Sequence, residues 1–205
     1  MKWEFSHNLQ EEQFDDNVDI NFTCLFFKNQ NIQNKQLKFQ TLREICFQNC
    51  KFKNVNFDNT FFVKVEFINC EFDSVNFTES NLSKIRIFDS KFTNTSFFET
   101  RFDNAHFKES LIQYSKLENV IIDVSKFDDV TFRDNIHRHN KYREVLFYKC
   151  ELNLENFIDV IFKNCDLKTS EFKGVNINLD DLISSKLSII NVIDILQDKG
   201  LIIEE

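Results

Sequence analysis

Large apolar residues occupy every fifth position between Leu42 and Phe132 without a break. A period of five matches neither the 3.6 residues of an α-helix nor the two residues of a β-strand, so either element would scatter these side chains around its surface. The pattern instead predicts a solenoid, in which the chain coils on itself and turns one large side chain inward per repeat. The phenylalanines of this register are the predicted core: Phe47, Phe52, Phe57, Phe62, Phe67, Phe72, Phe77, Phe92, Phe97, Phe102, Phe107, Phe127 and Phe132.

A second register lies two residues before each large residue. From Ile45 to Val130 it holds small or β-branched residues and no charged ones. The second position after each large residue is instead rich in Asn and Asp, which tolerate left-handed backbone better than other residues with a side chain. Because the chain has no proline and only two glycines, we expect these residues to form the corners of the coil.

Units such as Cys50-Lys51-Phe52-Lys53-Asn54 and Cys165-Asp166-Leu167-Lys168-Thr169 resemble the pentapeptide-repeat family, whose motif is a small residue, Asp or Asn, Leu or Phe, and two polar residues. The resemblance implies an all-β solenoid, a right-handed quadrilateral β-helix with four repeats per coil. Residues twenty apart would then stack at the strand spacing of about 4.8 Å, giving roughly eight coils and a length of about 40 Å.

The continuous repeat favours one domain with three parts: an N-terminal cap at 1–20, the β-helix at 21–182, and a C-terminal helix and tail at 183–205. Two segments, 28–36 and 133–141, place polar residues in the inward registers. In the first these are Gln30 and Lys35; in the second they are Asn135, His137 and Asn140. The first can be a run of distorted repeats or a loop that bulges from the coil, and a loop is predicted for both. In the quinolone-resistance branch of the family, loops leave the coil and contact the partner, so the resemblance implies a similar use.

The segment 133–141 is also the most basic part of the chain, with Arg133, Arg138 and Lys141. It can be a solvated loop or a partner-contact loop. A metal site is less favoured, because His137 and His139 would point to opposite sides of an extended segment.

Near the C-terminus Ile189, Val192, Ile193 and Leu196 follow helical spacing. Ser184 or Ser185 can cap the start of this helix, and Gly200 is placed to end it. One apolar side would cover the last coil, and the other needs a second surface. We therefore predict a homodimer, similar to the dimerisation module of the quinolone-resistance branch, through Leu187, Ile190, Ile193, Leu196 and Ile202.

The net charge of −8 argues against direct nucleic acid binding and permits a basic partner. The chain has no long apolar run and no apolar secretory segment near its start, which predicts a cytoplasmic protein without membrane contact. Four of the six cysteines, Cys50, Cys70, Cys150 and Cys165, fall in the small register and are interpreted as core fillers. Cys50 and Cys70 would stack, so a disulfide between them is conceivable in an oxidising setting.

No nucleophile elbow, phosphate-binding glycine loop or metal-spaced cysteine set is present, so we expect neither an enzyme nor a cofactor. Stacking twenty residues apart places Asp89, Glu109 and Asp129 in one column and Glu79 with Glu99 in another. These columns can belong to an ordinary face of mixed charge, or their carboxylates can imitate DNA phosphates. The resemblance implies the second: a DNA mimic that binds DNA gyrase or topoisomerase IV and protects it from quinolones. The alternative is an interaction scaffold with an unrelated partner, because this fold does not fix a role.

Overall fold

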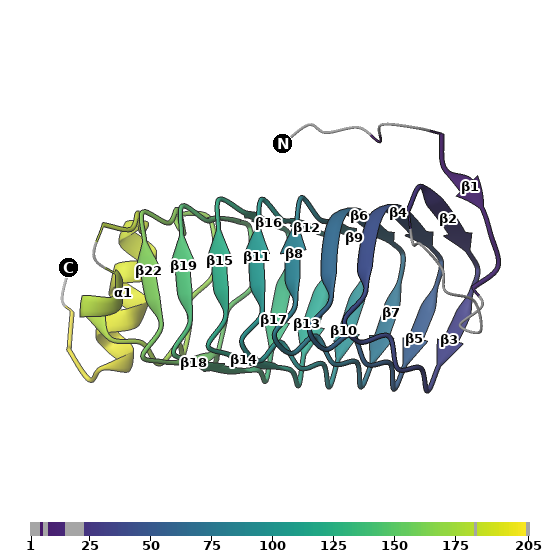
Figure 1. Ribbon diagram of the computed structural model, residues 1–205. Coiled ribbons are helices and arrows are strands. Elements are labelled where there is room, and N and C mark those ends of the chain that lie inside the picture. The colour runs from purple at the N-terminus through teal and green to yellow at the C-terminus, as the bar shows by residue number, and fades with distance from the viewer. Residues whose placement is uncertain (1–4, 6–7, 15–22, 183, 204–205) are drawn as a thin grey trace.

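The computed structural model describes residues 5, 8–14, 23–182 and 184–203. They form a right-handed quadrilateral parallel β-helix with one helix, α1, against its C-terminal end (Figure 1). From β2 onward the strands pair in parallel with a constant shift of twenty residues, as in Phe52↔Phe72 and Ile112↔Phe132. The described elements are β1 (Gln10–Glu11), β2 (Leu25–Lys28), β3 (Asn31–Gln33), β4 (Thr41–Gln48), β5 (Lys51–Lys53), β6 (Phe61–Ile68), β7 (Glu71–Asp73), β8 (Asn81–Ser83), β9 (Arg86–Phe88), β10 (Lys91–Thr93), β11 (Arg101–Asp103), β12 (His106–Lys108), β13 (Leu111–Gln113), β14 (Lys116–Glu118), β15 (Ile121–Asp123), β16 (Lys126–Asp128), β17 (Thr131–Arg133), β18 (Ile136–Arg138), β19 (Lys141–Arg143), β20 (Leu146–Tyr148), β21 (Asn156–Ile158), β22 (Ile161–Lys163), a 3-10 turn at Leu179–Leu182, and α1 (Ile189–Asp198).

The corners of the coil follow the predicted position. From Cys24 to Asn164 every fifth residue has a φ near +55°, and many of these residues are Asn or Asp. The same left-handed conformation also holds residues that do not favour it, including Phe39, Tyr114 and Val124. The fold therefore imposes the corner geometry whether or not the side chain prefers it.

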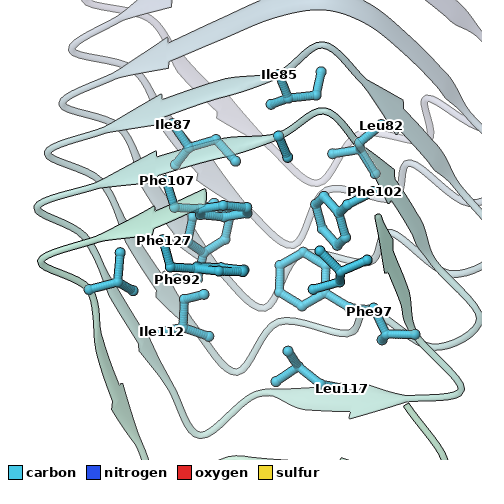
Figure 2. Close-up of a cluster of buried hydrophobic side chains, with 14 of the residues drawn as sticks. Leu82, Ile85, Ile87, Phe92, Phe97, Phe102, Phe107, Ile112, Leu117 and Phe127 are labelled. Carbon is cyan, nitrogen blue, oxygen red and sulfur yellow. The ribbon is translucent and has the colours of Figure 1, made fainter. Parts of the chain in front are cut away.

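The predicted phenylalanine core is confirmed, because all of its members are buried. Rings one coil apart lie flat on each other, with centroids 4.8 Å apart for Phe52 and Phe72 and 4.3 Å for Phe72 and Phe92. Figure 2 shows the middle of this stack, where leucine and isoleucine side chains lie among the phenylalanines.

Hydroxyl groups in the small register add to the ladder of hydrogen bonds that joins successive coils. Ser80 Oγ donates to the carbonyl of Phe57 at 2.6 Å and accepts from the backbone N–H of Thr60 at 3.2 Å. Buried polar atoms are tolerated here because each finds a partner in the neighbouring coil.

The predicted loops at 28–36 and 133–141 are wrong. The first segment contains β3 with Ile32 buried inside it, while Gln30 and Lys35 are only half-buried and lie near the beginning of the described coils. The second contains β18 in regular register with β14 and β21. Its polar residues Asn135, His137 and Asn140 point into the core, where they make hydrogen bonds and a charge contact instead of leaving the coil.

The two ends of the β-helix differ. Within the predicted cap at 1–20, β1 pairs in parallel with β2, and Phe14 packs edge-on against Phe27 at 5.7 Å; residues 1–4, 6–7 and 15–20 lie outside the described part. At the other end the ladder continues to Lys186, whose N–H donates to the carbonyl of Cys165. The helix consequently starts later than predicted, with Ser188 and not Ser184 or Ser185 as N-cap. Ser185 is instead used by the ladder, through its hydroxyl bond to the Phe162 carbonyl.

Candidate partner-binding surfaces

The acidic residues Asp89, Glu109 and Asp129 occupy one corner of three successive coils. Each has its backbone N–H bonded to the next coil, at 3.0, 2.9 and 2.8 Å respectively, and each side chain is exposed. The β-helix therefore stacks these carboxylates as the twenty-residue spacing predicts. We call these three residues the acidic corner.

The acidic corner is short. Before it, the same column holds Asn49 and Asn69, whose side-chain amides bond to each other at 2.9 Å, and after it comes Lys149. Lys108 lies 2.8 Å from Glu109 and holds the pKa of that carboxyl below its usual range, so Glu109 keeps its charge at neutral pH. Like charges stacked at strand spacing repel, and Lys108 offsets part of that repulsion.

A shallow groove of about 500 Å³ continues from the acidic corner toward the C-terminal end. It is lined by Asp129, Thr131, Lys149, Cys150, Glu151, Thr169 and Glu171. Glu151 and Glu171 are twenty residues apart and form a parallel bridge, so they add two carboxylates to the same edge of the molecule. Glu151 and Glu171 are not among the site residues predicted from the sequence, although the twenty-residue spacing that groups the acidic corner also groups this pair.

Glu79 and Glu99 stack on each other, and both are exposed. Their column is two corners away from the acidic corner, since the corners of one coil fall at residues 89, 94, 99 and 104. The structure thus places the two predicted acidic columns on opposite edges of the β-helix, and they do not form one surface.

Basic side chains are spread over several sides of the β-helix. Arg133, Arg138 and Lys141 point outward from β17, β18 and β19. On the side formed by β11, β15 and β19, Asp123 is held between Arg101, at 2.8 Å, and Arg143, at 2.5 Å. The acidic corner is therefore local, and the molecule as a whole carries mixed charge.

The C-terminal end carries an exposed apolar surface. Inward-facing Ile195 is buried against the last coil, whereas Ile190 is 70% and Ile202 90% exposed. The other predicted interface residues, Leu187, Ile193 and Leu196, are half-buried. Exposed Ile189, Val192 and Leu201 extend this apolar end, which is defined by α1 and the residues after it.

The cysteines and the potential metal ligands have to meet the usual requirements of reactive thiols and metal sites to support chemistry. Cys46, Cys50, Cys70, Cys150 and Cys165 are buried free thiols. Burial raises the pKa of Cys46 and Cys150 to about 12, so these two thiols suit core filling and not nucleophilic reactivity. No three His, Cys, Asp or Glu side chains within the described ranges come together as a metal site. Where the structure is described, it contains no helix long and apolar enough to cross a bilayer.

The family model for pentapeptide repeats, in eight copies, matches residues 45–83, and the same repeat continues through the coils on both sides of that segment. The chain has the pentapeptide-repeat fold. The matching model describes a structural repeat and no catalytic domain.

Two solved structures of QnrB1, described as a plasmid-mediated fluoroquinolone resistance protein, are similar to this chain. One, a trypsin-treated variant, has 16% sequence identity over 90% of this chain and 92% of its own, with a TM-score of 0.76. A second trypsin-treated variant has 15% identity, covers 97% of this chain and 100% of its own, and gives a TM-score of 0.72. At these identities the similarity is one of fold. No curated protein matches the chain in sequence.

Proposed function

We propose that this protein acts without catalysis, as a DNA mimic that binds a type II topoisomerase, DNA gyrase or topoisomerase IV, in the cytoplasm. The observation that carries the proposal is the acidic corner of Asp89, Glu109 and Asp129, on a fold similar to that of a fluoroquinolone resistance protein. Bound in this way, the protein would modulate the enzyme or protect it from quinolones.

The acidic corner supports this role through charge and shape. A rigid β-helix holds carboxylates one strand spacing apart, about 4.8 Å, along an edge that a basic DNA-binding groove can follow. The groove with Glu151 and Glu171 lengthens that edge. Binding is expected to weaken as salt rises, since the Debye length falls to about 8–10 Å near physiological ionic strength.

We also propose that two copies join through the apolar end. Contiguous exposed apolar surface of this kind is uncommon on a monomer, and association of two copies through the same patch buries it on both. Such a dimer would double the length of the acidic rod.

A gyrase supercoiling assay, with and without a fluoroquinolone, tests the proposal. The wild type should inhibit gyrase or restore supercoiling in the presence of the drug. The triple variant Asp89→Lys, Glu109→Lys, Asp129→Lys should lose this effect, and the double variant Glu79→Lys, Glu99→Lys, on the opposite edge, serves as the matched control. A wild type without effect at micromolar concentration rejects the topoisomerase proposal. A triple variant as active as the wild type rejects the acidic corner as the site.

The second candidate is an interaction scaffold for an unrelated partner. The separation of the acidic columns onto opposite edges, and the outward Arg133, Arg138 and Lys141, favour it over a continuous phosphate-like surface. Partner binding that is insensitive to salt would support the scaffold, because a DNA mimic depends on charge.

A further inference from the structure

A cluster of polar side chains lies inside the apolar core between β17 and β21. Its members are all buried, and they are Asn135, His137, Asn140, Tyr142 and Glu155. His137 and Glu155 are each only 1% exposed. The His137 ring lies 4.6 Å from the Phe157 ring and 6.0 Å from the Phe132 ring, so aromatic neighbours keep water away from it.

The two asparagines, Asn135 and Asn140, bond to the backbone of the preceding coil through both the oxygen and the nitrogen of their side-chain amides. Their side-chain oxygens accept the backbone N–H groups of Ser115 and Val120 at 3.0 and 2.8 Å. Their amide nitrogens donate to the carbonyls of Ile112 and Leu117 at 2.9 and 2.7 Å. They are therefore structural, and they explain why polar residues fit the inward register here.

Glu155 makes the same kind of hydrogen bond between coils, since its carboxylate accepts the backbone N–H of Asn135 at 3.3 Å. A hydroxyl makes the equivalent bond two coils earlier in the same column, where Ser115 accepts from the N–H of Thr95 at 3.1 Å. A serine would thus serve the ladder at position 155, and the carboxylate brings a charge that the ladder does not need.

That charge faces His137. The Nε2 atom of the ring lies 3.0 Å from Glu155 Oε2, and it makes no well-aligned hydrogen bond within the described part of the chain. The Nδ1 atom lies 3.4 Å from the Tyr142 hydroxyl. The contact between His137 and Glu155 is therefore a close approach of an imidazole nitrogen to a carboxylate oxygen.

The other groups around the pair are neutral or distant. Burial raises the pKa of Tyr142, and the Glu155 charge raises it further, so the phenol stays protonated. Burial also raises the pKa of the nearby Cys165 thiol to about 11. The charged residues of the surrounding strands, namely Lys116, Glu118, Arg133, Arg138, Lys141, Arg143 and Lys163, lie on the outer side of the coil.

We propose that His137 and Glu155 form a buried pair that shares one proton and thereby makes the stability of the β-helix depend on pH. A buried carboxylate without a compensating positive charge is strongly destabilising, and so is a buried imidazolium without its carboxylate. With one proton between them the pair is neutral overall. Folding therefore favours the state in which the pair keeps that proton.

The direction of the pH effect follows from the proton count. In the unfolded chain Glu and His titrate at their ordinary values of about 4.3 and 6.5, so above about pH 6.5 the unfolded pair holds no proton. The folded pair still holds one, so stability falls as pH rises, by up to about tenfold in the folded-to-unfolded ratio per pH unit. Below about pH 4.3 the unfolded pair takes up a second proton, and stability falls on that side as well.

Urea unfolding between pH 6 and pH 9 tests the proposal in the full-length protein. The comparison is the double variant His137→Phe with Glu155→Ser, which restores an ordinary repeat, and Glu155→Gln provides a second, nearly isosteric variant. The wild type should lose stability relative to both variants as pH rises, while His139→Gln, at an exposed position, should follow the wild type. Parallel profiles for the wild type and both pair variants would overturn the proposal.

The proton itself can be followed through the ring C2 proton of His137 in NMR spectra. We expect its shift to stay constant from pH 6 to pH 8. A constant shift at the charged position places the proton on His137 and supports the pair. A constant shift at the neutral position supports the pair only together with the loss of stability at high pH, which then places the proton on Glu155; without that loss it contradicts the proposal. Ordinary titration of His137 near pH 6.5 without loss of stability contradicts it.

Discussion

The side-chain amide of Asn191 donates to the backbone carbonyl of Ser170 at 2.7 Å and so fastens α1 to the last coil. The same asparagine accepts the backbone N–H of Ser188 at 2.9 Å and completes the capping box of the helix. One buried residue thus both starts the helix and orients it over the end of the core, with Ile195 packed beneath. The exposed side of α1 is fixed by this contact.

Replacing Asn191 with Ala should lower the free energy of unfolding by about 1–3 kcal/mol, because the Ser170 carbonyl and the helix N-terminus lose their buried partner. Gln197→Ala, at an exposed position of the same helix, is the control and should have little effect. Urea unfolding monitored by circular dichroism measures both variants. Equal midpoints for the two would show that the cap does not hold the helix in place.

Truncating the inward Phe97 to Ala should cost about 3–5 kcal/mol through lost burial and the cavity left in the stack. Phe97 lies on Phe77 at 5.4 Å between centroids, and its neighbour Phe98 points outward. Phe98→Ala is therefore the matched control and should cost clearly less. A similar cost for the two variants, measured by chemical denaturation, would contradict the inward register.

The fold could be predicted from the sequence because a five-residue period has few structural solutions. In addition, each position of the repeat has the same orientation, inward or outward, in every coil. Leu42 to Phe132 point inward wherever the period says so. The predicted loop at 133–141 was wrong because it rested on the polarity of Asn135 and Asn140, which was expected to keep both side chains out of the core. Inside the coil the relevant property is their ability to bond the backbone of the neighbouring coil, which is visible only once residues twenty apart are compared.

The candidate surface was predicted only in part. Stacking correctly grouped Asp89 with Glu109 and Asp129, since that requires only the coil length. The late start of the helix at Ser188 could not be predicted, because Ser184, Ser185 and Ser188 are all acceptable caps and the ladder decides among them. The contact of His137 with Glu155 is equally hidden, because it joins neighbouring columns of the core and not members of one column.

Val124 is strained, and Val124→Asn should stabilise the protein by about 1 kcal/mol. Its φ is +47° and its side chain is 54% exposed, so a β-branched residue occupies a left-handed corner without a burial gain that compensates. The reciprocal change Asn119→Val, at the preceding corner with φ +56°, should destabilise by a similar amount. Denaturation midpoints that move in the same direction for the two variants would refute the argument from backbone strain.

The apolar end should control self-association. We expect the wild type to scatter light as a dimer at micromolar concentration, and the double variant Ile190→Glu, Ile202→Glu to scatter as a monomer, because a charge on each exposed side chain opposes burial of that surface. Phe61→Glu is the control: Phe61 is also exposed, but it lies in β6, far from α1 along the β-helix (Figure 1). Since both replaced isoleucines are exposed, unfolding midpoints of the double variant extrapolated to low protein concentration should stay close to those of the wild type. A wild type that is monomeric, or a dimer disrupted equally by Phe61→Glu, would exclude the C-terminal interface.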